Sequence, residues 1–213
     1  MEQKRKNLVT LFWINIPVIV LYYLIYTLPG MRPYGNMVYF ACMLASGYFL
    51  GKSFDVNIKN KWDKNVRIRY LALGVSLMLF LYLIMRVSFG AIGKIPKLQG
   101  LVDLGLWQYF VRPWHEVNIL VSVSGVIMIV IAVEMFYRVY VQNTFNLYFD
   151  NKTAILLASV ISGARACALG PVSGLVDFSL AFIWGWIYLK SGFWPVVVTH
   201  MVWDVCFVYF PAG

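Results

Sequence analysis

The residues best suited to chemistry lie in the most apolar stretches of the chain. In GFWPVVVTHMVWDVCFVYF, residues 192–210, His200 and Asp204 are four positions apart. In VIAVEMFYRVYVQ, residues 130–142, Glu134 and Arg138 have the same spacing. Side chains four residues apart share one face of a helix, so each pair can interact. An imidazole and a carboxylate are the groups that most often move protons in enzymes.

A second layer of charge is formed by Arg165 and Asp177, on either side of Pro171. A tight hairpin at this proline would bring the two residues to one depth. An Arg165–Asp177 ion pair is then a sufficient structural interpretation, and Asp204 is the competing partner of Arg165. Structural interpretations also exist for the other two pairs, because a hydrogen-bonded or ionic pair can simply fix how helices pack.

The composition explains why these groups are notable. The chain has 213 residues, of which 61% are hydrophobic and only 13% are charged, whereas a soluble domain is about half apolar and a quarter charged. We therefore expect a membrane protein whose main partner is the lipid bilayer, and we do not interpret the net charge of +9 as a nucleic-acid footprint. The three cysteines and two histidines show no metal-binding or disulfide spacing, so no metal or cofactor is expected.

The positions of the apolar runs predict an all-α, polytopic transmembrane helix bundle of about seven spans, forming a single domain over residues 1–213. Residues 1–90 would hold three helices, 91–117 an external or interfacial segment, and 118–213 the core. The expected spans are 8–28, 36–52, 68–90, 118–141, 153–170, 173–190 and 193–211.

Basic residues are concentrated before the first expected span and between the second and third. The positive-inside rule then places the N-terminus in the cytoplasm and the C-terminus outside, and the compact size favours a bacterial plasma membrane. On this topology Glu134 lies about seven residues before the cytoplasmic end of its helix, and His200 about seven residues after the start of its own. At ~1.5 Å per residue both lie ~10 Å below the cytoplasmic face, at one level.

Two passages resemble the CAAX-processing and bacteriocin-processing intramembrane protease family, also called CPBP or Abi. Glu134 and Arg138 match the second glutamate and the arginine of its EExxxR motif. In FSLAFIWGWIYLKSGFWPVVVTHMVWD, residues 178–204, His200 and Asp204 match its closing HxxxN or HxxxD motif. The resemblance covers residues 115–210 and implies a helical intramembrane-protease fold with a glutamic-type endopeptidase site.

The chain departs from this family at two positions. The first glutamate of EExxxR, which the resemblance implies would activate water, is Val133 here. The family's second motif, FxxxH, supplies a further histidine, but the equivalent positions are Ala166 or Cys167. Losing a base or an oxyanion donor typically removes two to four orders of magnitude of rate each.

Three functions follow as hypotheses. The first is a protease-like membrane protein with little or no peptidase activity that binds another membrane protein, a peptide or a lipid-linked ligand, in regulation, immunity or envelope processing. The second is an active endopeptidase that processes a C-terminal or precursor peptide, with Glu134 as base and His200 as electrophile. The third is a small transporter or channel subunit, since intramembrane charges suit ion relays, although no repeated broken helices support it.

Overall fold

The computed structural model describes residues 64–92, 94–95, 119–167 and 170–209, with ten isolated positions between 10 and 45. The described part of the chain is helical, as predicted, and contains no strand. Most of the expected spans 8–28 and 36–52, and most of the segment 91–117, lie outside the described residues. The helices are α3 (Lys64–Ile92), α6 (Ile119–Glu134), η1 (Met135–Gln142), α7 (Asn143–Asn146), α8 (Asn151–Ala166), α9 (Pro171–Ser191) and α10 (Phe193–Tyr209).

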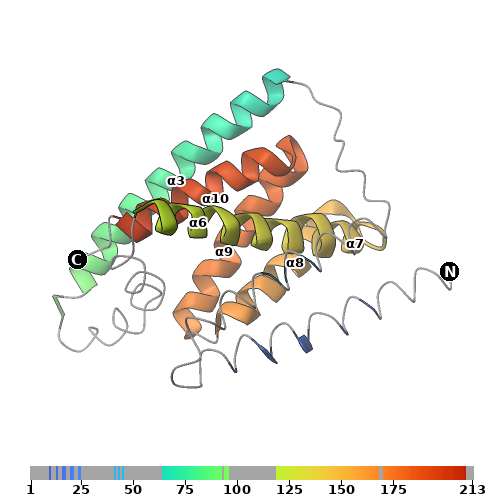
Figure 1. Ribbon diagram of the computed structural model, residues 1–213, viewed down its shortest axis with the longest axis horizontal. Coiled ribbons are helices and arrows are strands. Elements are labelled where there is room, and N and C mark those ends of the chain that lie inside the picture. The colour runs from blue at the N-terminus through green and yellow to red at the C-terminus, as the bar shows by residue number, and fades with distance from the viewer. Residues whose placement is uncertain are drawn as a thin grey trace.

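The segments α6, η1 and α7 form one continuous rod (Figure 1). The expected helix end near residue 141 is therefore wrong, and Glu134 lies well inside the rod, twelve residues before Asn146. Two polar side chains just beyond position 141 are satisfied within the helix. Asn143 Nδ2 donates to the Val139 carbonyl at 3.0 Å, and Thr144 Oγ1 donates to the Tyr140 carbonyl at 2.7 Å.

The middle part of this rod, η1, is a π-helix of eight residues. A π-helix bonds each backbone N–H five residues back instead of four, and such turns are rare and frequently found at functional sites. Seven of the eight residues of η1 are buried: Phe136, Tyr137, Arg138, Val139, Tyr140, Val141 and Gln142. The widened turn therefore lies in the protein interior, next to the residues that the sequence singled out.

Helices α8 and α9 form a hairpin whose two arms approach closely. A Cβ atom added to Gly163 would lie 2.7 Å from Phe178 Cβ and 2.8 Å from the Gly174 carbonyl oxygen. A Cβ atom on Gly174 would collide with the Cys167 sulfur. Small residues let membrane helices approach backbone to backbone, so this glycine pair sets the tight crossing. Gly170, with φ of 129°, precedes Pro171 and makes the turn that an L-residue would adopt only with strain.

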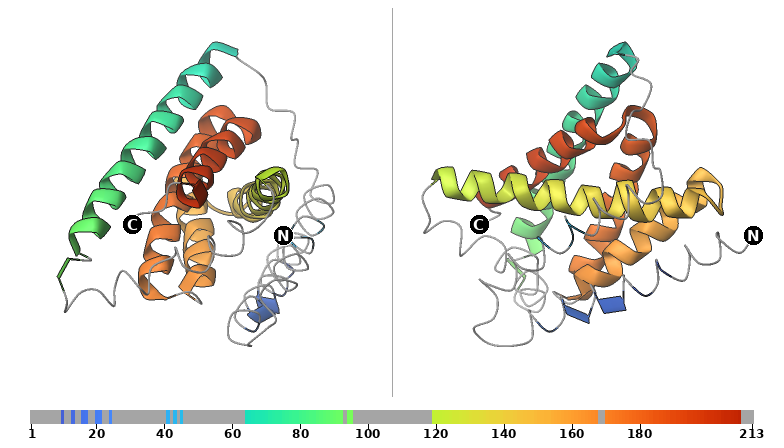
Figure 2. Two further views of the ribbon diagram at one scale, coloured as in Figure 1. Left: turned by 60° about the vertical axis from the view of Figure 1, so that its left-hand side comes forward. Right: turned by 45° about the vertical axis from the view of Figure 1, so that its right-hand side comes forward.

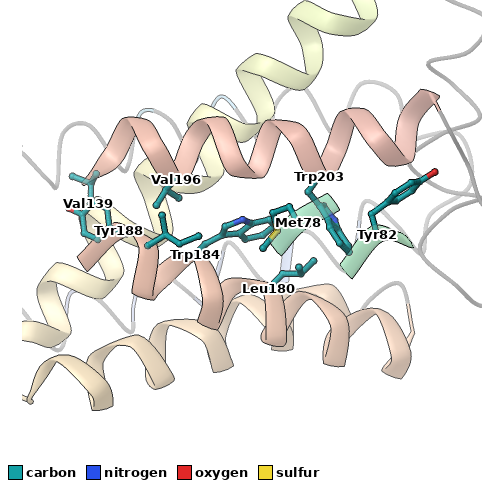
Figure 3. Packing of buried hydrophobic residues seen from close by; sticks show 9 residues of the cluster. Met78, Tyr82, Val139, Leu180, Trp184, Tyr188, Val196 and Trp203 are labelled. Carbon is teal, nitrogen blue, oxygen red and sulfur yellow. The ribbon is translucent and has the colours of Figure 1, made fainter. Parts of the chain in front are cut away.

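Helix α10 is the central element, because it contacts α3, α6, η1 and α9. Figure 2 shows α10 between α3 on one side and the α6 rod on the other. A hydrophobic cluster joins α3, η1, α9 and α10 along this helix (Figure 3). Its buried members are Met78, Tyr82, Val139, Leu180, Trp184, Ile187, Tyr188, Val196 and Trp203.

Three segments of the described chain are long and apolar enough to cross a membrane: Ile68–Ser88, Val123–Asn146 and Pro171–Ser191. The apolar helix Phe193–Cys206 is shorter. On α3 much of the apolar surface is exposed, including Leu73 at 64% and Val87 at 72%, as expected for a helix that faces lipid. The total of seven spans stays a prediction, as do the two topological ends.

Candidate functional site

Glu134 is the centre of a buried polar network, and both of its carboxylate oxygens are in use. Arg138 Nε donates to Oε2 at 3.1 Å, one turn along the same rod. Oε1 lies 2.6 Å from His200 Nδ1 on α10. Glu134 itself has no exposed surface. The two residues that the sequence placed at one level are therefore in direct contact, although the rod extends further beyond Glu134 than expected.

Arg138 is held from a second side by a residue that sequence analysis did not include. Its Nη1 donates to Gln142 Oε1 at 3.3 Å, and Gln142 Nε2 donates to the Gly185 carbonyl of α9 at 3.2 Å. Gln142 is four residues after Arg138, so the repeat of polar residues at 134, 138 and 142 was a visible signal. Gly185 leaves room for the amide, since a Cβ atom there would lie 3.1 Å from Gln142 Oε1.

His200 is held on one ring face as well as at Nδ1. The Trp184 indole of α9 stacks on the imidazole, with centroids 3.7 Å apart and planes inclined by 19°. Sequence analysis did not select Trp184, because an aromatic residue in an apolar helix usually serves packing. The indole is 3% exposed, and its Nε1 has no hydrogen-bond partner. Figure 3 shows its ring between α9 and α10.

Asp204 lies on the same face of α10 as His200, one turn along. Its Oδ1 is 3.7 Å from His200 Nε2, which is longer than a hydrogen bond. The Asp204 side chain is 28% exposed, against 9% for that of His200. Asp204 is thus the partly exposed end of the network, whereas Glu134 is its fully buried end.

Arg165 and Asp177 form the second layer, joining α8 to α9. Arg165 Nη2 donates to Asp177 Oδ1 at 3.2 Å, and Ser162 Oγ donates to Asp177 Oδ2. The Arg165 guanidinium also lies over the Tyr137 ring, 5.6 Å from its centroid. Of the two partners considered for Arg165, Asp177 is the one in contact. Asp177 and Arg165 both act electrostatically on Asp204, so the two layers are neighbours.

At the two positions where the family resemblance requires catalytic groups, the chain has small apolar side chains. Val133 is 8% exposed and Ala166 is 2% exposed, while Cys167, the alternative to Ala166, is an exposed free cysteine. None of these positions offers a carboxylate or an imidazole to the interior. No cluster of three or more histidine, cysteine, aspartate or glutamate side chains suited to a metal ion occurs among the described residues.

A helical membrane bundle with buried glutamate, arginine and histidine shared between two helices defines an intramembrane-protease-like core. Residues 114–206 match the family model described as type II CAAX prenyl endopeptidase Rce1-like. This match confirms the resemblance found in the sequence, over residues 114–206. No curated protein and no solved structure matches the chain.

Proposed function

We propose that this integral membrane protein uses its protease-like core to bind a membrane partner or peptide, and that it has little or no peptidase activity. The proposal depends on one observation: both carboxylate oxygens of Glu134 already have partners. A general base must lie within hydrogen-bond reach of the water that it activates. Glu134 has no exposed surface, and its two oxygens already contact Arg138 and His200.

Because both oxygens of Glu134 are occupied, the residues of the network take different roles. Glu134 serves as a positioning residue that orients His200, because a carboxylate bonded to one ring nitrogen fixes the tautomer and the ring orientation. Arg138 and Gln142 brace the carboxylate from the other side. The parts of the network that remain open to a ligand are His200 Nε2 and Asp204.

The active-endopeptidase hypothesis assigned the base to Glu134 and the electrophile to His200. The contacts of Glu134 weigh against that assignment, and the valine at position 133 leaves no second carboxylate beside it on the rod. An ionised Asp204 would also repel an oxyanion that developed near His200 Nε2. Each of these points lowers the rate that the site can reach.

The test combines cleavage with partner recovery. Purified protein in lipid nanodiscs is incubated with a prenylated CAAX-type peptide, and wild type and His200→Ala should cleave it at the same background rate. Affinity purification from membranes then compares wild type, His200→Ala and the control variant Leu79→Ala, whose side chain is exposed on α3. We expect co-purifying membrane proteins or peptides to be lost only with His200→Ala. Cleavage that requires His200, or recovery that is unchanged by its removal, contradicts the proposal.

A further inference from the structure

The hydrogen bond between Glu134 and His200 fixes which ring nitrogen carries the proton. Glu134 also accepts a charged hydrogen bond from Arg138, so it is a carboxylate and can only accept. The proton in the 2.6 Å contact to Oε1 therefore belongs to His200 Nδ1. In the neutral imidazole the other nitrogen, Nε2, is then an acceptor.

Nε2 faces a second acceptor. The Asp204 carboxylate lies 3.7 Å away, too far for a hydrogen bond and close for two acceptors that have no donor between them. The Trp184 indole covers a face of the imidazole ring, so a ligand reaches the histidine along its Nε2 edge. His200 is only 7% exposed, so this nitrogen cannot rely on bulk water.

The net charge of the ionisable groups around Asp204 also indicates that a positive group is missing. The two arginines of the network each have a carboxylate of their own, Glu134 for Arg138 and Asp177 for Arg165. Arg165 acts on Asp204 electrostatically, but its ion pair is with Asp177. With a neutral imidazole and an ionised Asp204, the six ionisable groups sum to one negative charge. Asp204 is eleven residues into α10, which corresponds to ~16 Å along the helix axis. A lone charge inside an apolar region is costly unless something pairs with it.

We infer that this site takes a cationic N–H donor, the ammonium group of a lysine in a partner's membrane-spanning helix, between His200 Nε2 and Asp204. An ammonium carries three donors and one positive charge, so it satisfies both acceptors and balances the charge. The partial exposure of Asp204 gives it an approach from the apolar surface. A ligand carboxylate has the wrong polarity for this site. The inference rests on the proposed binding function and names its ligand chemistry.

The experiment uses the whole protein in vesicles of phosphatidylcholine. Three fluorescent peptides with a leucine–alanine membrane-spanning sequence carry a single Lys, Gln or Glu at one mid-membrane position, and binding is measured by energy transfer to labelled protein. We expect the Lys peptide to bind at least about tenfold more tightly than the Gln peptide, a difference of ~1.4 kcal/mol, and the Glu peptide to bind most weakly.

Three variants locate the effect. Asp204→Asn should abolish the preference for lysine, whereas Asp150→Asn, the same chemical change at an exposed carboxylate, should keep it. Asp204→Glu, which restores the charge, should retain part of the preference. The wild-type comparison decides the question even where a variant fails to fold.

Equal binding of the Lys and Gln peptides, no binding of the Lys peptide, or a preference that survives Asp204→Asn overturns the inference. Equal binding would mean that a proton on Nε2 or on Asp204 closes the gap instead. The proposed function is contradicted by different results: cleavage that requires His200, or partner recovery that is unchanged in His200→Ala. The two failures are therefore distinguishable.

Discussion

The imidazole of His200 lies flat against the indole of Trp184, with 3.7 Å between the ring centroids. This contact joins α10 to α9 at the point where the polar network meets the hydrophobic cluster. It also leaves the indole Nε1 buried without an acceptor. Trp184 is therefore both a packing residue and a wall of the site.

Replacing Trp184 separates these two roles. Trp184→Ala should lower the free energy of unfolding by about 3–5 kcal/mol, because it empties a large core position. Trp184→Phe should cost less than half of that, since an aromatic face stays on His200 and an unsatisfied donor is removed. Thermal and denaturant unfolding in detergent measure both variants. Equal losses for the two would show that the ring face contributes nothing.

Arg138 keeps a buried carboxylate neutralised. Arg138→Met should destabilise the protein by about 3–5 kcal/mol, because it leaves Glu134 charged and buried with only His200 beside it. Adding Glu134→Gln to the same chain should recover much of this loss. Arg86→Met, at an exposed arginine that donates to the Tyr82 hydroxyl, is the control and should have a small effect. A double variant as unstable as the single one would contradict this account.

Gly74 lets α3 approach α10 immediately beside the site. A Cβ atom there would lie 2.6 Å from Thr199 Cγ2, next to His200, and 3.0 Å from Ile187 Cδ1. Gly74→Ala should therefore cost about 1–3 kcal/mol through overpacking. Gly90→Ala on the same helix meets nothing within 4 Å and should be neutral or stabilising by up to about 1 kcal/mol. Unfolding midpoints of the two variants would decide, and matching values would rule out a close contact.

The Arg165–Asp177 pair should show energetic coupling. Single variants Arg165→Met and Asp177→Asn and their double variant form a cycle, and we expect a coupling of about 0.5–3 kcal/mol from the 3.2 Å contact. The two side chains are 6% and 18% exposed, so solvent screens the pair little. Additive losses within the error of the unfolding measurement would mean that the contact contributes no net energy.

The start of α8 should be sensitive to acid. The Thr153 hydroxyl, with the Lys152 backbone N–H, holds the pKa of Asp150 below its ordinary value of 3.8. A lowered pKa means that this cap stabilises the helix above the ordinary value and stops doing so as the pH falls through the lowered one. Asp150→Ala should therefore be less stable at neutral pH and lose less stability below pH 3.8 than wild type. An unchanged pH profile would contradict this.

Much of the fold could be predicted from the sequence, because long apolar runs and their breaks are local signals. Pro171 and the Ser191–Gly192 turn marked the hairpins around α9, and the turns lie there. The end of the α6 rod was placed too early. Asn143 and Thr144 follow the apolar run, but their side chains bond to the helix backbone, so the helix continues through them.

The site could be predicted only in part. Spacing placed Glu134, Arg138, His200 and Asp204 in pairs, and the hairpin made Asp177 one of two partners considered for Arg165. The repeat of polar residues at 134, 138 and 142 was a signal for Gln142, but its bond to the Gly185 carbonyl depends on how η1 meets α9, and the π-helical turn was not predicted. Trp184 was missed because stacking on an imidazole depends on how two helices meet, which a single helix does not encode.

The rod also carries a consequence for how the chain enters the bilayer. His200 is synthesised 66 residues after Glu134, so the nascent chain carries the carboxylate before its histidine exists. Each charged residue at the centre of an inserting helix costs about 2.5–3.5 kcal/mol. Because Arg138 travels on the same helix at 3.1 Å, the nascent segment carries its own counterion into the membrane. Biogenesis of the protease-like core thus begins with a self-neutralised helix and is completed when α10 arrives.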